Sequence, residues 1–151
     1  MRILVQRVTE ARVTVNDNTV AAVGRGLLVF LGIAKTDTLA DADYLVEKLL
    51  GLRIFPDDAG KMNRNVSQAG GRLLIVSQFT LYADCRRGRR PSFDMAAPPE
   101  QASTLYNYFV ESAAKSQVAV ESGIFQAHMQ VTLSNDGPVT ILIDSGERNQ
   151  R

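Results

Sequence analysis

The sequence predicts a compact α/β domain in which mixed or antiparallel β-sheets curl in a barrel-like way and two main helices pack on them. Short apolar runs bounded by turn residues recur along the chain, and two stretches have helical spacing. The 151 residues are 45% hydrophobic, and a chain of this length buries about 70% of its unfolded surface. We therefore expect a single domain over residues 1–151, without a linker or an internal repeat.

The N-terminal part has the pattern of a hairpin followed by a buried strand. Residues 2–8 and 11–15 are predicted strands, and Asn16-Asp17-Asn18 is a turn cluster that leads into a third strand at residues 19–23. Residues 26–33 are nearly all apolar. Such a run is typical of a strand that is covered on both faces.

Two stretches are predicted to be helical. The first follows residues 36–38 (Thr, Asp, Thr), any of which can cap a helix, and Gly51 lies near its end. The second begins at Pro99, a residue suited to the first helical position, and runs to about residue 117. Their apolar stripes consist of Leu39, Ala42, Leu45, Val46, Leu49 and Leu50 in the first helix and Ala102, Leu105, Tyr106, Phe109, Val110 and Ala113 in the second.

The remaining predicted elements are short strands and polar loops. A strand at residues 52–55, a turn at 56–60 and a polar loop at 61–71 lead to a strand at 72–79. Residues 83–99 combine four arginines with three prolines, which indicates an ordered surface loop or arm. The closing strands are expected at residues 118–121, 128–133 and 139–143.

Composition excludes several classes of protein. Cys85 is the only cysteine, so the chain can form neither an internal disulfide nor a cysteine-based zinc cluster. Residues 27–34 form the longest apolar stretch, far shorter than the roughly 20 residues that span a bilayer. Residues 1–7 lack the apolar core of a signal peptide. We therefore expect a soluble, cytoplasmic protein without a membrane partner.

A first candidate site is Ser77-Gln78-Phe79-Thr80-Leu81-Tyr82, which directly follows the apolar run at residues 73–76. Its polar side chains emerge where a buried strand meets solvent. Main-chain N–H groups around Gln78 and Phe79, together with the Ser77 hydroxyl, could bind and polarise a carbonyl. A strand-to-turn junction stabilised by serine and threonine hydrogen bonds has the same spacing, and spacing alone does not distinguish the two interpretations.

A second candidate site is Asn135-Asp136-Gly137-Pro138-Val139-Thr140. Glycine allows a backbone to approach a ligand closely, and proline makes that backbone rigid. The alternative is a plain turn that starts the last strand. The sequence does not reveal whether the Gly137–Pro138 bond is cis or trans. Together, the two segments suggest a small site built largely from main chain.

Other familiar sites have little support. The sequence has no phosphate-binding glycine loop, dinucleotide fingerprint or zinc-protease histidine pair, and we expect no cofactor and no metal. His128, the only histidine, suits a solvent-facing strand better than a catalytic base, and its pairing with Cys85 has no recognised signature. Ser77 and Thr80 are candidate nucleophiles that lack an adjacent base. Solvated or turn roles are expected for the carboxylates Asp84, Asp94, Asp136 and Asp144.

A basic run surrounds Gly88 and consists of Arg86, Arg87, Arg89 and Arg90. Seventeen basic and sixteen acidic residues give the whole chain a formal charge of +1, so any polyanion site must be local. Guanidinium groups bind phosphate oxygens bidentately. The run therefore indicates contact with phosphate or RNA, and a solvated loop is the alternative.

These motifs occur together in a known family. Over essentially its full length, the chain closely resembles the D-aminoacyl-tRNA deacylases of the bacterial and eukaryotic type. The matching segments are Met1-Arg2-Ile3-Leu4-Val5-Gln6-Arg7-Val8, then Arg53-Ile54-Phe55 with Asp57, Gly60, Lys61, Met62 and Asn63, then residues 77–82, Arg90-Pro91-Ser92-Phe93, and residues 135–140.

The resemblance implies hydrolysis of the ester between tRNA and a D-amino acid, or glycine mischarged on tRNA-Ala, while L-aminoacyl-tRNA is spared. It implies a homodimer in which a cis Gly137-Pro138 step enters the pocket of the partner, where it excludes an L side chain by a built-in clash. That pocket contains residues 77–80. The resemblance also implies that the tRNA 2′-hydroxyl assists the chemistry, although a rival view in the family makes Thr80 the nucleophile.

Two other functions stay open at this point. A small-molecule esterase would use the corner at residues 77–80 without RNA and would hydrolyse free D-amino acid esters. A nucleic-acid-binding module would act through residues 86–90, and its binding would be salt-sensitive without any hydrolysis.

Overall fold

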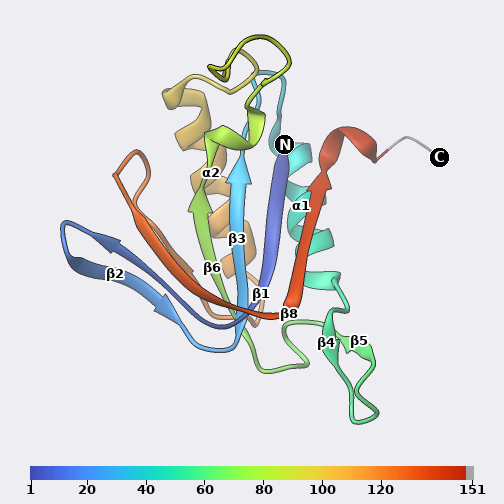
Figure 1. Cartoon of the computed structure of the whole chain (residues 1–151). Helices are drawn as coiled ribbons and strands as arrows, with labels where there is room; N and C mark the ends of the chain where they lie inside the picture. The colour runs from blue at the N-terminus through green and yellow to red at the C-terminus, as the bar shows by residue number, and fades with distance from the viewer. Residues whose placement is uncertain (149–151) are drawn as a thin grey trace.

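The computed structural model of the protein describes residues 1–148 and has a six-stranded mixed sheet, a small two-stranded sheet and two α-helices (Figure 1). In chain order the elements are β1 (Arg2–Val15), β2 (Asn18–Val23), β3 (Gly26–Gly32), α1 (Leu39–Gly51), β4 (Phe55–Pro56), β5 (Met62–Arg64), β6 (Arg72–Ser77), the 3₁₀ helix η1 (Phe79–Tyr82), α2 (Pro99–Ala114), β7 (Val120–Ser122), β8 (Gln130–Asp144) and the 3₁₀ helix η2 (Ser145–Glu147).

The long strand β1 organises the main sheet. Along one edge it pairs antiparallel with β3 through residues 2–8 and with β2 through residues 11–15, and β8 pairs antiparallel with it over most of its length. β3, β6 and β7 continue the sheet in parallel. Contacts of β2 with β6 and β7 show that the sheet curls into a nearly closed barrel.

The core has two parts, one on each face of the curled sheet. Both helices lie on one face of the sheet (Figure 1), where α1 and α2 contribute Leu45, Leu49 and Phe109 to a cluster with alternate strand residues such as Val5 and Val29. The second cluster fills the curl and includes Val8, Val13, Leu28 and Leu74. Because neighbouring residues of β3 point into different clusters, this strand is buried on both faces, as its continuous apolar run predicts.

The helices begin where the sequence predicts. Among the three candidate caps Thr38 is the N-cap of α1, and its N–H donates to the Asp41 carboxylate at 2.9 Å. Asp37 instead accepts the N–H of Ala34 at 2.6 Å, so its carboxylate stabilises the preceding turn. Pro99 is the first residue of α2, and the helix ends at Ala114, three residues before the predicted end.

Several predicted boundaries are wrong, and tertiary pairing explains each difference. The two strands expected before residue 16 are a single strand, because β8 pairs on both sides of the break. Residues 52–55 and the expected polar loop contain the β4–β5 hairpin, whose turn is closed by the Asp57 carboxylate accepting the N–H groups of Ala59 and Lys61. The strand expected to reach Phe79 ends at Ser77. The last two expected strands form one strand, β8.

The compact α/β domain, the mixed barrel-like sheet and the two helices are thus confirmed. None of the helices in residues 1–148 has the length and apolar character needed to cross a membrane.

Candidate functional site

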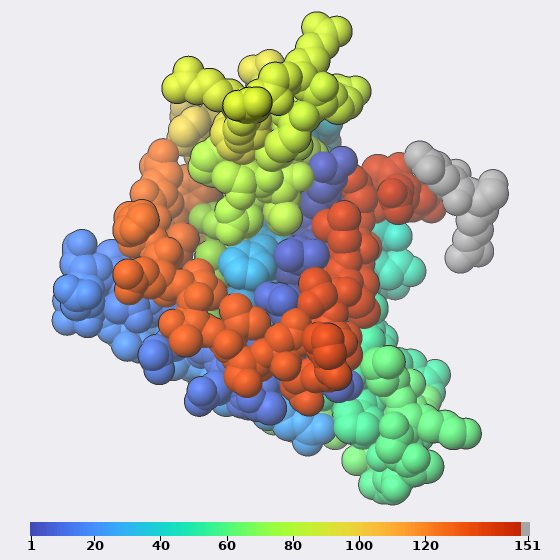
Figure 2. All heavy atoms as spheres, viewed as in Figure 1, coloured from blue at the N-terminus to red at the C-terminus, as the bar shows by residue number. Residues whose placement is uncertain are grey.

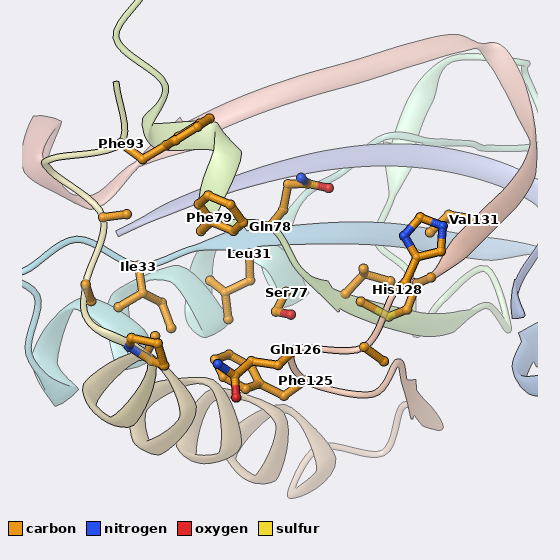
Figure 3. Close-up of a pocket in the computed structure, with 17 residues that line it drawn as sticks. Leu31, Ile33, Ser77, Gln78, Phe79, Phe93, Phe125, Gln126, His128 and Val131 are labelled. Carbon is orange, nitrogen blue, oxygen red and sulfur yellow. The ribbon is translucent and has the colours of Figure 1, made fainter. Parts of the chain in front are cut away.

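A cavity of about 650 Å³ opens at the C-terminal end of β6, beside η1 and the start of α2 (Figure 3). Its walls are largely apolar and come from segments far apart in the sequence. The lining residues are Leu31, Ile33, Val76, Ser77, Gln78, Phe79, Phe93, Ala96, Ala97, Pro99, Ala102, Phe125, Gln126, Ala127, His128, Met129 and Val131. Three of the four predicted catalytic residues, Ser77, Gln78 and Phe79, therefore border one hollow.

The end of β6 positions these three residues. Ser77 is paired with Leu31 of β3, and the Gln78 N–H donates to the Leu31 carbonyl at 2.8 Å. Since this bond uses the Gln78 N–H, the prediction that this N–H helps to bind a substrate carbonyl is wrong. The parallel pairing of β3 with β6 thus fixes the end of the strand. Any main-chain N–H that binds a substrate carbonyl must come from the residues after Gln78.

The chain turns into η1 immediately after Gln78, and this turn presents two N–H groups. Leu81 N–H bonds to the Gln78 carbonyl at 3.2 Å, and Ala83 N–H bonds to the Thr80 carbonyl at 3.0 Å. Within residues 1–148, no protein oxygen accepts the N–H of Phe79 or Thr80. Amide groups of this kind can stabilise a developing oxyanion.

Thr80 lies next to the cavity without lining it. Its side chain is exposed, and its hydroxyl accepts a hydrogen bond from the Gln78 side-chain amide. Thr80 therefore holds the Gln78 side chain rather than facing the hollow. Within the described chain, neither the Ser77 nor the Thr80 hydroxyl bonds to an imidazole or a carboxylate, so the structure gives neither hydroxyl a base.

A glycine lets η1 approach the sheet. A Cβ atom on Gly32 would lie 3.0 Å from the Leu81 Cβ and 3.1 Å from the Gln78 carbonyl oxygen. These distances are tighter than most contacts of a real Cβ atom, so a side chain at Gly32 would push the turn away from β3. The absence of that side chain helps to set the position of the Phe79 N–H.

Aromatic side chains form the opposing walls of the cavity. The rings of Phe79 and Phe93 meet edge to face with centroids 5.0 Å apart, and Phe79 is 59% exposed. Phe125 packs on Tyr106, with centroids 5.6 Å apart. Sequence reasoning missed this second wall, because nothing in the pattern around Phe125 brings it to the end of β6.

The segment before β8 supplies the polar rim of the cavity. Gln126 has a positive φ of 63°. Figure 3 shows its side chain beside Phe125 and that of His128 beside Val131, at the edge of the cavity. His128 is exposed, as predicted, but it precedes β8 instead of lying on a strand. Cys85 is also exposed and does not line the cavity.

The Gly137-Pro138 step lies within β8, in a bulge. Gln6 pairs with Thr140 and Val8 with Asn135, so the single residue Arg7 faces the four residues 136–139. The Gly137–Pro138 bond is cis, and both residues are exposed. The segment therefore interrupts a strand, and the interpretation as a plain turn that starts the last strand is wrong.

Arg7 holds this bulge from the sheet side. Its Nε donates to the Asp136 carbonyl at 3.1 Å and lies 3.2 Å from the Asp136 carboxylate, while Nη1 donates to the Ile54 carbonyl at 2.5 Å. Gly137 has a φ of +133°, and a Cβ there would lie 2.8 Å from Val139 Cγ2. Glycine is thus required at this position. Neither Gly137 nor Pro138 lines the cavity of its own chain.

The arginine run forms the tip of an arm between η1 and Phe93. Asp84 and Ser92 close its base through two main-chain hydrogen bonds of 2.7 and 2.9 Å. Hydrogen bonds from the Arg86 guanidinium and N–H lower the pKa of Asp84 to about 2. In the part of the chain that the structure describes, no acidic group pairs with the other exposed arginines, which are Arg87, Arg89 and Arg90.

The other candidate carboxylate residues take part in ion pairs or in a local turn. Asp136 pairs with Arg7, and Asp144 pairs with Arg2 at 2.6 Å. The N–H of Asp94 donates to the Ser92 hydroxyl at 3.3 Å in a local turn. Among residues 1–148, no three His, Cys, Asp or Glu side chains gather closely enough to hold a metal ion.

Comparison with known sequences identifies the family. The chain matches the family described as D-Tyr-tRNA(Tyr) deacylase over residues 4–144. The D-aminoacyl-tRNA deacylase of Solibacter usitatus (strain Ellin6076) is 62% identical, and the match covers 100% of both chains. The enzyme of that name from Thermotoga petrophila (strain ATCC BAA-488 / DSM 13995 / JCM 10881 / RKU-1) is 56% identical over 97% of this chain and 99% of the relative.

Solved structures agree on the fold. One titled c-Myc DNA Unwinding Element Binding Protein is 43% identical, with a TM-score of 0.91 and coverage of 95% of this chain and 98% of the other. A probable eukaryotic D-amino acid tRNA deacylase has a TM-score of 0.82 at 18% identity over 94% of this chain and 97% of the other, which shows the fold alone. The family match and the full-length relatives confirm the resemblance seen in the motifs, and the chain belongs to the D-aminoacyl-tRNA deacylase family.

Proposed function

We propose that the protein hydrolyses the ester bond of D-aminoacyl-tRNA, and of glycyl-tRNA mischarged on tRNA-Ala, to release free tRNA and the amino acid. The observation that carries this proposal is the position of Ser77, Gln78 and Phe79 at one end of an apolar cavity, beside the free N–H groups of Phe79 and Thr80. Membership of the family supports the same substrate class.

The main-chain donors fit the electrostatic part of ester hydrolysis. When water adds to the acyl carbon, negative charge develops on the carbonyl oxygen, and N–H groups directed at that oxygen stabilise it. The acyl C–O bond then breaks, and the tRNA 3′-oxygen takes up a proton. Because the Ser77 and Thr80 hydroxyls lack a base, we assign proton transfer to the neighbouring ribose 2′-hydroxyl of the tRNA, which the site holds in place. Thr80 then has a binding role and is not the nucleophile.

The cavity is large enough for more than an amino acid. Its volume of about 650 Å³ lies within the range of ligand pockets that bury a drug-sized molecule. The rings of Phe93 and Phe125 offer apolar faces of the kind on which an unpaired base stacks. We assign this apolar part to the terminal nucleoside of the tRNA and the end near Phe79 to the ester.

Chiral selection is assigned to the Gly137-Pro138 step of a second copy of the chain. The step is exposed, is held rigidly through Arg7 and lies outside the cavity of its own chain. Inserted beside the α-carbon of the substrate, such a main-chain wall would clash with an L side chain and leave room for hydrogen or a D side chain.

The face of the sheet opposite the helices favours the homodimer that this arrangement needs. Leu4 pairs with Phe30 on one side and Leu142 on the other, so three apolar side chains lie side by side across β3, β1 and β8. Leu142 is 59% exposed, and Figure 2 shows parts of these three strands open on one face. A self-complementary patch of this kind suits a two-fold interface.

The arginine arm is assigned to the tRNA backbone. Arg87, Arg89 and Arg90 are exposed, and the arm leads directly to Phe93 in the cavity wall. Phosphate contacts near the cavity would hold the acceptor end of the tRNA without reading its sequence. Such contacts weaken as the salt concentration rises.

The first test is hydrolysis of matched D-, L- and glycyl-tRNA by the purified protein, with the corresponding free amino-acid esters as controls. We expect rapid release from D- and glycyl-tRNA and almost none from L-tRNA. Equal hydrolysis of free D-amino acid esters would instead identify a small-molecule esterase. The proposal is wrong if a folded dimer releases nothing from any charged tRNA.

A second candidate function is nucleic-acid binding without hydrolysis. It is favoured by the exposed arginines of the arm and by the name of the structural relative that is 43% identical. It predicts that binding to uncharged RNA or DNA falls steeply with salt and that Ser77, Gln78 and Phe79 can be replaced without loss. Hydrolysis of D-aminoacyl-tRNA that depends on these three residues would exclude it.

A further inference from the structure

Arg2, at the start of β1, ties three elements together. Its Nε donates to the Asp144 carboxylate of β8 at 2.6 Å, and its Nη1 donates to the Leu81 carbonyl of η1 at 3.0 Å. The guanidinium also lies over the Tyr82 ring, 4.5 Å from its centroid. One side chain therefore contacts two consecutive residues of the turn that follows Phe79.

The partners of the Arg2 guanidinium are themselves held in place. Asp144 also accepts the Gly146 N–H at 2.9 Å, which fixes the orientation of the carboxylate. Burial raises the pKa of Asp144, but the hydrogen bonds from Arg2 and Gly146 outweigh this effect. The net result is a pKa below the usual value, so the carboxyl group stays ionised. Burial is also the main cause of the raised pKa of Tyr82, so its ring stays a neutral phenol beneath the cation.

The turn held by Arg2 is the one that carries the free N–H groups. η1 is a single turn over Phe79–Tyr82, so a shift at Leu81 or Tyr82 is transmitted within one turn to the N–H of Phe79. Neither Arg2, Leu81 nor Tyr82 lines the cavity. Arg2 thus acts on the site from outside it and does not reach a substrate in the cavity.

We propose that Arg2, oriented by Asp144, is a positioning residue for deacylation, because it sets the place of the η1 turn and thereby the aim of the Phe79 and Thr80 N–H groups at the ester carbonyl. This inference rests on the proposed carbonyl-binding role of those groups. A misplacement of about 1 Å can cost about 100-fold in rate, so a residue that fixes the turn affects kcat without binding substrate.

The experiment compares Arg2→Met with Arg2→Lys and Asp144→Asn in steady-state hydrolysis of D-aminoacyl-tRNA. We expect Arg2→Met to lower kcat by about 10- to 100-fold, with KM within about twofold of the wild-type value. Arg2→Lys restores part of kcat, because an ammonium can donate to Leu81 or Asp144 but lacks the planar fork that reaches both. Because Asp144 acts through Arg2, the double variant Arg2→Met/Asp144→Asn should lose less transition-state stabilisation than the sum of the losses in the two single variants.

The matched control is Arg72→Met, which removes another ion pair of the same sheet. Arg72 lies at the far end of β6 and pairs with Glu121 at 3.1 Å, and neither residue lines the cavity. We expect its kcat to match that of the wild type. Thermal melting and gel filtration of every variant show whether a loss of kcat occurs in a folded protein of unchanged size.

Three results would overturn the inference while leaving the proposed function intact. They are an Arg2→Met enzyme with wild-type kcat, a loss confined to KM, and a lower melting temperature with unchanged kcat per folded molecule. A wild-type protein that leaves D-aminoacyl-tRNA intact would instead overturn the proposed function itself. The two failures are therefore distinguishable in one set of assays.

Discussion

Phe79 offers the cavity two separate groups, an exposed aromatic ring and a main-chain N–H. A substitution that changes only the side chain therefore does not test the proposed oxyanion role. Proline removes the N–H, and 3₁₀ dihedrals suit its fixed φ. The preceding residue, Gln78, has φ −145° and ψ 79°, a non-helical conformation of the kind found before proline.

We predict that Phe79→Pro lowers kcat by about 100-fold, because one oxyanion donor is lost. Phe79→Leu keeps the N–H and serves as the control, with kcat within about threefold of the wild type. Single-turnover hydrolysis of D-aminoacyl-tRNA measures both, and circular dichroism checks the fold. Similar losses in the two variants would mean that the ring, and not the N–H, supports the reaction.

Asp144 gives a prediction about pH. The pKa of Asp144 in the folded protein lies below the usual value of a carboxyl group, because the hydrogen bonds from Arg2 and Gly146 outweigh burial, which raises it. Its contribution to stability is therefore fully present above the unfolded pKa of about 3.9 and is lost as the pH falls through the lower folded value. Urea unfolding should show that the difference in unfolding free energy between wild type and Asp144→Asn is larger at pH 7 than at a pH below the folded pKa of Asp144. A constant difference would contradict this assignment.

The sequence predicts the residues of the corner better than it predicts which atoms are free. Ser77, Gln78 and Phe79 border the cavity as a group, and the apolar run at residues 73–76 places them at a strand end. The Gln78 N–H is occupied by the carbonyl of Leu31, and Thr80 turns toward Gln78. The first fact depends on two strands that meet only in three dimensions. The second depends on the η1 turn, which the sequence does not predict.

The contact between β3 and η1 is the element-scale feature that most directly sets the site. Pairing of β6 with β3 ends at Ser77, and the next turn rests on Gly32, which has no side chain to hold it off. The sequence predicts β3 and β6, because both are continuous apolar runs. It does not predict η1, since a four-residue 3₁₀ helix has no periodic signature of its own.

We predict that Gly32→Ala lowers kcat by about 10-fold, because its Cβ would lie 3.0 to 3.1 Å from atoms of Leu81 and Gln78 and shift the turn. Gly51→Ala is the control, since a Cβ there meets nothing within 4 Å. Steady-state kinetics and melting temperatures of both variants provide the measurement. Unchanged kcat in a folded Gly32→Ala protein would show that the turn tolerates the displacement.

At the scale of the whole molecule, two parts of the proposed site are separate within one chain. The cavity opens at the end of β6, whereas the Gly137-Pro138 bulge is exposed on β8 and does not line it. A single chain thus presents both halves of the proposed site without joining them. Sequence patterns find the two motifs, but local patterns within one chain carry no information about the second copy that we propose to join them.

Mixed dimers test this arrangement. Phe79→Pro damages the cavity, and Gly137→Ala places a Cβ 2.8 Å from Val139 Cγ2 in the bulge. If each site combines the cavity of one chain with the bulge of the other, each mixed dimer has one intact site and one doubly damaged site. Random mixing of the two inactive variants should then restore about a quarter of wild-type activity. Gel filtration first establishes that each variant is dimeric, and no recovery in mixed dimers would place the complete site within one chain.

The single strand β1 carries both Arg2, which holds the η1 turn, and Arg7, which holds the bulge. Five residue steps of extended chain separate their Cα atoms by about 17 Å, so the number of residues between them fixes the distance between the η1 turn and the bulge. One inserted residue would turn one of the two arginines to the opposite face of the sheet. Changes of length within this family should therefore accumulate in the hairpin turns and the arginine arm, while the five steps between these two side chains stay constant.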